Sequence, residues 1–274
     1  MAKQLFRKLT VSLLFPKKVI VSLGSDYLAL AETKGRGLNG WRIEHFSLLD
    51  KNNLDSILAK LQTWLSELAH QKIDLALRLS TDLAPICLLP WRNEITNPEQ
   101  QALIAEAYFK NIYGNEANQW KVSVNSPDFG EAWVASGVAV ETLENINVQL
   151  SSAGANITSS APLSISIFNN IRNDIKASHA WLLIPEFKNL VAIYLIDGQW
   201  RLIQTLLLSD LEGESLSEML KRETRLAGFA EHPFQIYSVG ALPLNANTIK
   251  LSLGWDISPT ISAHQPTYLV GGVK

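Results

Sequence analysis

The sequence of 274 residues has few of the features that identify a chemistry. Its one cysteine, Cys87, cannot form an internal disulfide or supply a zinc site. It also lacks an excess of basic residues: it has 24 Lys and Arg and 26 Asp and Glu, which gives a formal net charge of −2. A binder of duplex nucleic acid normally carries such an excess to neutralise phosphates, so no nucleic acid partner is expected. The scarcity of cysteine fits a reducing cytoplasm.

Long apolar runs and catalytic motifs are missing as well. A membrane-spanning helix needs about 18–20 consecutive apolar residues, and the most apolar stretch, residues 181–196, is broken by Pro185, Glu186 and Lys188. No Walker, dinucleotide-binding or nucleophile-elbow motif occurs. The histidines show no metal-ligand spacing and are expected to be isolated: His45, His70, His179, His232 and His264. The composition, 47% hydrophobic and 18% charged, is that of a globular α/β protein.

Positive charge is concentrated at the N-terminus. Five basic residues precede the first acid, Asp26: Lys3, Arg7, Lys8, Lys17 and Lys18. Leu5, Leu9 and Leu13 recur every four residues between them, which fits a short amphipathic helix that contacts anionic lipid or a membrane partner. A solvated, frayed terminus is the alternative. A secretory signal is disfavoured, because the apolar core is short and no small-residue cleavage site follows.

The first third of the chain predicts three strands, a helix and a fourth strand. Apolar residues mark one helical face over 54–68, which makes this the clearest helix. Apolar and alternating runs predict the strands at 19–24, 28–32, 41–48 and 73–79. This order resembles the start of the ribonuclease-H-like unit of the actin and sugar-kinase superfamily.

The same order recurs in the second half. Strands are predicted at 180–184, 190–196 and 200–207, a helix at 213–227, and further strands at 234–239 and 268–270. Between the two copies we expect strands at 86–89, 120–124, 131–137 and from 157, and helices at 98–113, from 140 to Gly154, and at 163–171. Asn97 and Pro98 provide a cap and a first residue for the helix at 98–113.

Two copies of one motif predict an α/β protein with mixed sheets and the actin-like ATPase fold, in which two ribonuclease-H-like lobes carry an insertion in the first. The expected divisions are a basic amphipathic segment at 1–16, a first lobe at 17–175 with an inserted subdomain at about 84–138, and a second, reduced lobe at 176–274.

The hairpins that bind phosphate in such ATPases are degenerate here. Each lobe of an actin-like ATPase presents a turn like Asp-x-Gly, whose backbone N–H groups cradle phosphate while the carboxylate acts through Mg²⁺. The first hairpin keeps Gly24 and Ser25 but has Ser22 in place of the acid, and Asp26 lies on the far arm of the turn. Mg²⁺ recruitment is therefore expected to be weak.

The second hairpin departs further. The predicted loop at 184–189 has no glycine, Pro185 lacks an N–H donor, and Glu186 would repel phosphate. Near the expected adenosine-binding end one glycine, Gly240, remains of the usual pair. The cofactor-binding positions are thus remnants, and no cofactor is expected; ATP with Mg²⁺ belongs to the alternative function.

Several motifs resemble the PilM-type actin-like proteins of type IV pilus assembly and the cytoplasmic domain of GspL-type components of type II secretion. They are the hairpin at 19–32, the motif Leu89-Pro90-Trp91-Arg92, and the run from Tyr113-Gly114 to Trp120. The resemblance implies a cytoplasmic protein that grips an inner-membrane partner. PilM-type relatives bind ATP, whereas GspL-type domains are actin-like scaffolds that do not depend on nucleotide.

The leading hypothesis is a non-catalytic actin-like scaffold, a pseudo-ATPase, at the cytoplasmic face of the inner membrane within a pilus or secretion assembly. The alternative is an ATP-binding ATPase or kinase with a rearranged site. A third possibility is a peripheral membrane protein whose N-terminal segment is the functional element.

Overall fold

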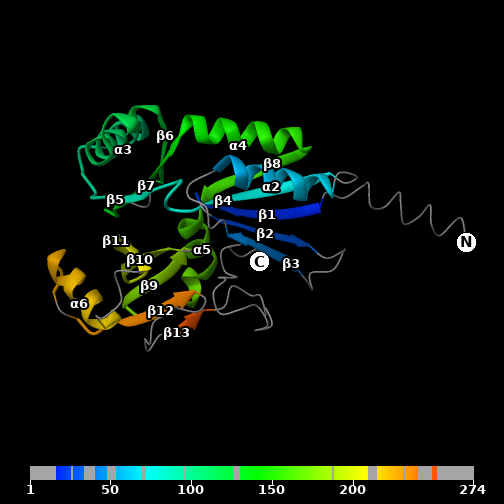
Figure 1. Cartoon of the computed structure of the whole chain (residues 1–274). Coiled ribbons are helices and arrows are strands. Elements are labelled where there is room, and N and C mark those ends of the chain that lie inside the picture. Colours follow the sequence, from blue (N-terminus) through cyan, green and yellow to red (C-terminus); the bar gives the residue numbers. More distant parts are fainter. Residues whose placement is uncertain are drawn as a thin grey trace, which may run out of the picture.

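The computed structural model describes residues 17–25, 27–33, 41–47, 54–68, 72–95, 97–125, 130–186, 188–208, 215–230, 232–239 and 249–251. The segment 1–16, with Lys3, Arg7 and Lys8, lies outside these ranges, as do Asp26, Gly240 and the strand predicted at 268–270. The described residues form two five-stranded sheets and one three-stranded sheet, with helices on their faces (Figure 1). The predicted domain boundaries remain predictions.

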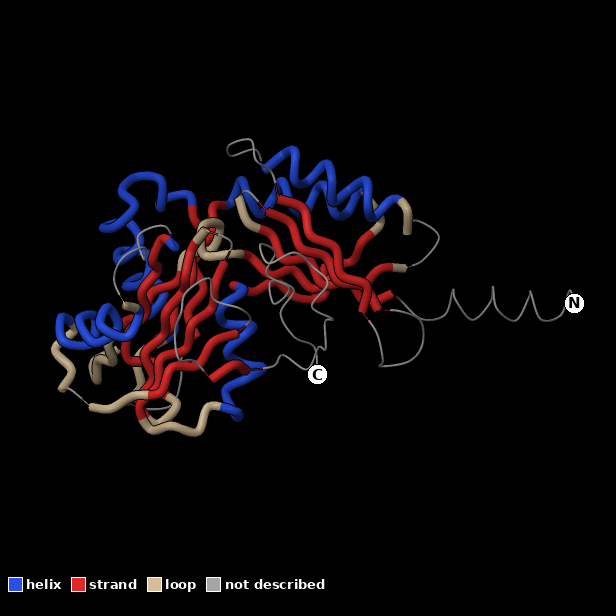
Figure 2. Tube along the Cα trace, turned by 60° about the horizontal axis from the view of Figure 1, so that its bottom comes forward, coloured by secondary structure: helices blue, strands red, loops and turns tan. Residues whose placement is uncertain are grey.

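The first lobe is built on the sheet β3-β2-β1-β4-β8. Its strands are β1 (Lys17–Leu23), β2 (Tyr27–Thr33), β3 (Trp41–Ser47), β4 (Ile73–Leu79) and β8 (Ala155–Pro162). The first three pair antiparallel, whereas β1–β4 and β4–β8 pair parallel. Helices α2 (Leu54–Ser66) and α4 (Val140–Ser152) cover one face (Figure 2). Ile57, Leu61 and Trp64 of α2 are buried there, which confirms the helical face expected from the sequence.

The second lobe repeats this plan in the sheet β11-β10-β9-β12-β13. Its strands are β9 (His179–Glu186), β10 (Asn189–Ile196), β11 (Gln199–Leu207), β12 (Gln235–Val239) and β13 (Ile249–Leu251). Again three strands form an antiparallel meander, and the strand after the helix pairs parallel with the first strand of the meander. The two sheets therefore have the same strand order, as the repeated sequence pattern predicts. Strand β13 was not expected.

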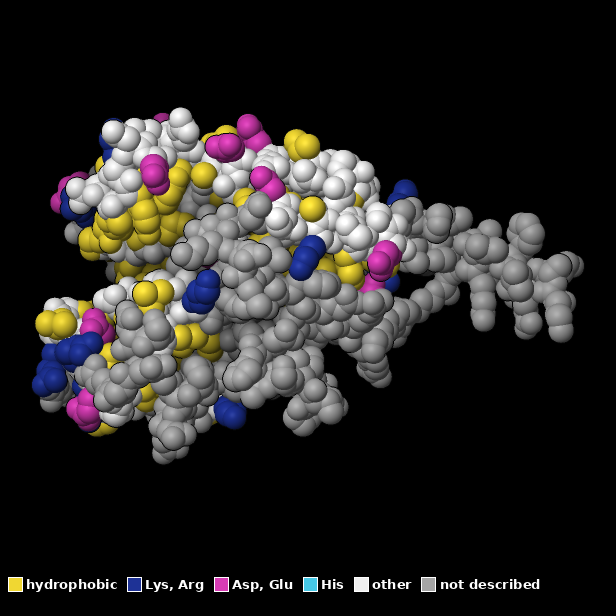
Figure 3. Space-filling view, viewed as in Figure 1, with side chains coloured by type: hydrophobic (Ala, Val, Ile, Leu, Met, Phe, Trp, Pro, Cys, Tyr) yellow, Lys and Arg dark blue, Asp and Glu magenta, His cyan; other side chains and the backbone are white. Residues whose placement is uncertain are grey.

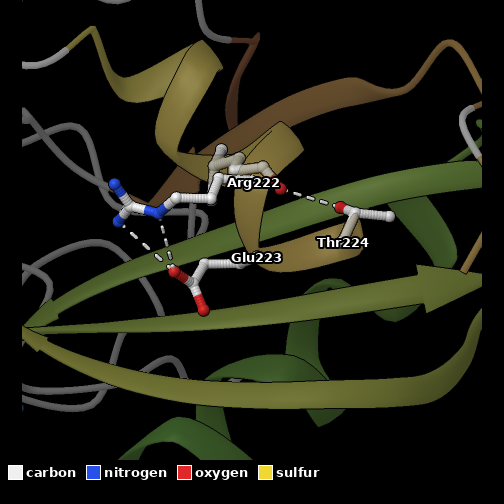
Figure 4. A network of polar contacts seen from close by, with 4 residues as sticks. Arg222, Glu223 and Thr224 are labelled. Atoms are coloured by element: carbon white, nitrogen blue, oxygen red, sulfur yellow. Dashed lines mark hydrogen bonds and ion pairs between the residues drawn. The ribbon is translucent and has the colours of Figure 1, made fainter. Parts of the chain in front are cut away.

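Helix α6 (Leu216–Leu226) covers the second sheet with its apolar side. Ser215 caps it by accepting a hydrogen bond from Glu218 N at 3.2 Å. On the buried side the Thr224 hydroxyl donates to Leu220 O at 2.8 Å and accepts from Trp181 Nε1 at 3.3 Å. On the solvent side Arg222 turns toward Glu223 at 3.4 Å (Figure 4). The amphipathic pattern thus fixes which side of α6 contacts the sheet.

A small third sheet is inserted between β4 and α4. It has the order β5-β7-β6, with β5 (Ile86–Leu89), β6 (Trp120–Asn125) and β7 (Trp133–Ala139), and carries α3 (Pro98–Tyr113) and a 3₁₀ helix at Gly114–Gln119. Asn97 Oδ1 accepts from Glu99 N at 2.8 Å, which confirms the predicted cap. Cys87 is buried against Phe109 and Trp133, and burial raises the pKa of its thiol to about 12, so it packs as an apolar residue.

The surface of the insertion carries several exposed apolar side chains. Hydrophobic side chains gather over α3 and the strands below it (Figure 3). On α3 the large apolar side chains that reach solvent are Leu103, Tyr108, Ile112 and Tyr113, with Leu103 63% and Ile112 53% exposed. At about 100° per residue, Leu103 and Ile112 lie on opposite sides of α3, so these exposed side chains do not form a single patch.

Helix α5 (Leu163–Ile171) joins the lobes. Its buried residues Leu163, Ile167 and Ile171 share one hydrophobic cluster with the inner faces of both large sheets, and α5 lies between those sheets (Figure 1). Ile86, Leu88 and Val134 of the insertion pack against the same cluster. The lobes and the insertion are therefore held by one core.

This shared core predicts cooperative unfolding. We expect Ile167→Ala to cost about 2–5 kcal/mol, since it removes buried apolar atoms that both lobes contact. Urea denaturation followed by fluorescence and circular dichroism will measure the loss and should give one coincident transition. Asn169→Ala, at an exposed position of the same helix, is the matched control and should change stability by less than about 0.5 kcal/mol. Two separate transitions in the unsubstituted protein would contradict the shared core.

Candidate functional site

The carboxyl ends of β1, β4 and β9 meet where the lobes touch. In open α/β sheets ligands bind beyond the carboxyl ends of the strands. β1 and β4 run parallel in register, with Leu23 opposite Leu79, so the turn after β1 lies beside the segment after β4. Glu186, the last residue of β9, reaches this place from the second lobe. We call this group the junction cluster: Ser22, Gly24, Ser25, Tyr27, Ser80, Thr81, Asp82 and Glu186.

The backbone donors of the first hairpin are already used by the protein. Gly24 N donates to Tyr27 O at 3.0 Å. Ser25 N donates to Asp82 Oδ2 at 2.7 Å, and the Ser80 hydroxyl donates to the other oxygen of this carboxylate. The turn N–H that would face an anion therefore binds a carboxylate of the chain itself, 57 residues away in sequence.

Gly24 permits a close approach, but the group that approaches is Tyr27. A Cβ at position 24 would overlap the ring of Tyr27, whose Cζ would lie 3.0 Å away. Tyr27 is buried, and burial followed by the charge of Glu186 raises its pKa well above the ordinary value, so it stays neutral. The space that a glycine opens for phosphate in an ATPase is thus filled by a side chain.

The second hairpin differs from its prediction. Residues 184–189 were expected to form the loop, but β9 continues through Glu186, with Pro185 opposite Leu190 and Glu186 opposite Asn189. Pairing with β10 prevails over the turn preference of Pro-Glu and places Glu186 in a strand. Glu186 is 2% exposed, and its Oε2 accepts a hydrogen bond from Thr81 N of the first lobe at 2.7 Å.

Burial sets the charge of Glu186. It raises the pKa of this carboxyl to about 7, the nearby charge of Asp82 adds to the increase, and hydrogen bonding from Thr81 opposes it. A raised carboxyl pKa means that the folded chain binds a proton more tightly than the unfolded chain. The stability that this proton contributes is complete below about pH 4.5 and is lost as the pH rises through about 7.

The described residues do not fit the phosphates of a nucleotide. The donors Ser25 N and Thr81 N are already paired with carboxylates, the ring of Tyr27 covers Gly24, and the second turn lacks a glycine. A triphosphate here would also stand against Asp82 and Glu186. Among the described residues no group of three or more His, Cys, Asp or Glu could hold a metal ion.

Other residues singled out in the sequence lie away from the junction. Lys17 Nζ pairs with the buried Glu32 at 2.5 Å, and Lys18 is exposed beside it. Their role in membrane or partner contact stays a prediction. The sequence predicts that His179 and His232 are isolated. In the structure their rings stack, with centroids 4.5 Å apart. None of the described helices is long and apolar enough to span a membrane.

Comparison with known proteins identifies the fold. No protein-family model and no curated protein sequence matches the chain. Among solved structures, the PilM–PilN type IV pilus biogenesis complex matches with a TM-score of 0.57 and 11% identity, over 81% of this chain and 80% of that one. The chain has the actin-like ATPase fold. The predicted fold class is thereby confirmed.

Two further structures agree. The cytoplasmic domain of EpsL, an inner membrane component of the type II secretion system of Vibrio cholerae, matches with a TM-score of 0.55 and 10% identity, over 85% of this chain and 87% of that one. A Bacteroides thetaiotaomicron protein with an actin-like ATPase fold matches with a TM-score of 0.53 and 16% identity, over 86% of this chain and 85% of that one. At these identities the likeness concerns the fold, and both types of protein named in the sequence resemblance are among the structural neighbours.

The packing of Tyr27 on Gly24 gives a test of the junction. We expect Gly24→Ala to cost about 1–3 kcal/mol, because the new methyl group meets the ring. In a Tyr27→Ala background the same change should cost much less, and urea denaturation of the four proteins completes a double-mutant cycle. An equal cost in both backgrounds would mean that the glycine is required for another reason.

Proposed function

We propose that this protein is a non-catalytic actin-like scaffold that docks at the cytoplasmic face of the inner membrane in a type IV pilus or type II secretion-like assembly. One observation carries the non-catalytic part: the backbone donors at the ends of β1 and β4 bind Asp82 and Glu186 of the chain itself. The structural neighbours that belong to such assemblies, the PilM–PilN complex and the EpsL domain, support the choice of system.

The connections between the lobes support a scaffold. An ATPase of this fold binds nucleotide between its lobes. Here the lobes share the core around α5, and Thr81 and Glu186 join them by a buried hydrogen bond. The insertion adds a contact, because Gln199 of β11 donates to Glu131 just before β7. These links favour a constant arrangement that does not need a ligand to hold it.

Nucleotide binding is the first test of this proposal. We expect titration of the protein with ATP and Mg²⁺ by calorimetry to give no detectable heat at millimolar nucleotide, since the donors are occupied and the cluster is acidic. The variant Asp82→Asn/Glu186→Gln keeps the shapes of the side chains and removes both charges. Heat that appears only with this variant would show that charge excludes the phosphates. Micromolar Mg²⁺-dependent binding to the unsubstituted protein would support the ATPase or kinase alternative instead.

The partner is the second test. We expect in-cell cross-linking, followed by purification from membranes, to recover an inner-membrane component of a pilus or secretion assembly. Leu103 and Ile112 are the most exposed large apolar residues of α3 and are suitable places to interrupt the contact, so Leu103→Asp/Ile112→Asp should lower the yield of this component at least tenfold. Val148→Asp, at a 65% exposed apolar position on α4, is the matched control. Recovery of no pilus or secretion component would contradict the proposed assembly.

A further inference from the structure

Glu186 is placed so that its charge affects how the lobes meet. It belongs to β9 of the second lobe, is 2% exposed, and accepts a hydrogen bond from Thr81 N of the first lobe at 2.7 Å. Because the donor is a backbone N–H, the contact depends on the position of β4 and not on a side-chain rotamer. Separating the lobes at this point would bring the carboxyl group into water.

The ionisable groups that face Glu186 are acids. Asp82, from the segment after β4, and Tyr27, from β2, interact with it electrostatically, and no described Lys, Arg or His pairs with it. Ser22 and Ser80 are buried and hydrogen-bond to the neighbouring Tyr27. A buried carboxylate without a cation is strongly disfavoured relative to the neutral acid. Ionised Glu186 therefore gains more from hydration than neutral Glu186 does.

We propose that the contact between the lobes is proton-linked: it is closed while Glu186 holds a proton, and it opens locally more often when Glu186 ionises. Neutral Glu186 still accepts the Thr81 N–H through its carbonyl oxygen, so closure does not require the charge. The ionised form adds a second negative charge beside Asp82 in a buried place, and water is the only strong new partner for it. The inference rests on the proposed function in treating the junction as a contact made by protein groups alone.

The pKa values fix the direction and size of the effect. The carboxyl group has a pKa of about 7 in the closed junction and an ordinary value of 4.5 in water. By linkage, the local opening equilibrium should then be about tenfold larger at pH 8 than at pH 6. Below about pH 4.5 the group is protonated in both states and has no effect on opening.

Hydrogen exchange of the free protein, without nucleotide or partner, tests this inference. We expect the protection factor of the peptide that contains Thr81 to fall about tenfold from pH 6 to pH 8, after correction for the intrinsic exchange rate. Glu186→Gln, which mimics the neutral acid, should abolish this dependence. Glu144→Gln, an exposed position on α4, should keep it. Protection that is independent of pH in the unsubstituted protein, or still dependent on pH in Glu186→Gln, would overturn the inference.

A direct titration covers the case in which Glu186→Gln does not fold. The carboxyl carbon of Glu186, followed by NMR in the unsubstituted protein, should titrate with a midpoint near 7. A midpoint near 4.5 would overturn the inference. Neither measurement uses nucleotide or a membrane partner, so the proton linkage and the proposed scaffold function can fail independently.

Discussion

The hydrogen bond from Thr81 N to Glu186 Oε2 is the interaction on which the junction depends. Both atoms are buried, and each would be costly to leave without a partner. The donor lies just after β4 and the acceptor at the end of β9, so this bond joins the first lobe to the second. The apolar cluster around α5 also joins the two lobes, through buried side chains of both large sheets. The Tyr27 ring and the Asp82 carboxylate then fill the places beside it.

Much of the fold can be predicted from the sequence because it depends on local patterns. The apolar face of α2, the cap at Asn97 and the repeated order of strands and helix all follow from the spacing of residues, and each is found in the structure. The sequence prediction fails where an element is too short to show a pattern, or where pairing between strands outweighs a local turn preference. β13 has three residues, too few for any periodicity. The Pro-Glu pair indicates a loop, yet the ladder with β10 continues to Glu186.

The candidate site could be predicted only in part. Gly24 and Ser25 follow a strand, which is sufficient to suggest an altered phosphate turn. The group that binds this turn could not be found in the same way, because Asp82 is 57 residues from Ser25, and Glu186 is 105 residues from Thr81. The one available signal was the polar run Ser80-Thr81-Asp82 directly after an apolar strand, at the same edge of the sheet as the first turn. Pairing across the lobes is a tertiary property that no local pattern encodes.

The backbone of this fold provides N–H groups at the ends of its central strands, and they need acceptors whatever the protein does. When an external phosphate is the acceptor, the arrangement of the lobes depends on a ligand that binds and dissociates. Internal carboxylates satisfy the same donors without a ligand, since they are joined to the chain and their effective concentration is high. The carboxylate of Asp82 then disfavours phosphate at the junction, and the protonation of Glu186 is the variable that remains there. Among the described helices α3 exposes the largest set of large apolar side chains, and for this reason we propose it as the place where a partner binds.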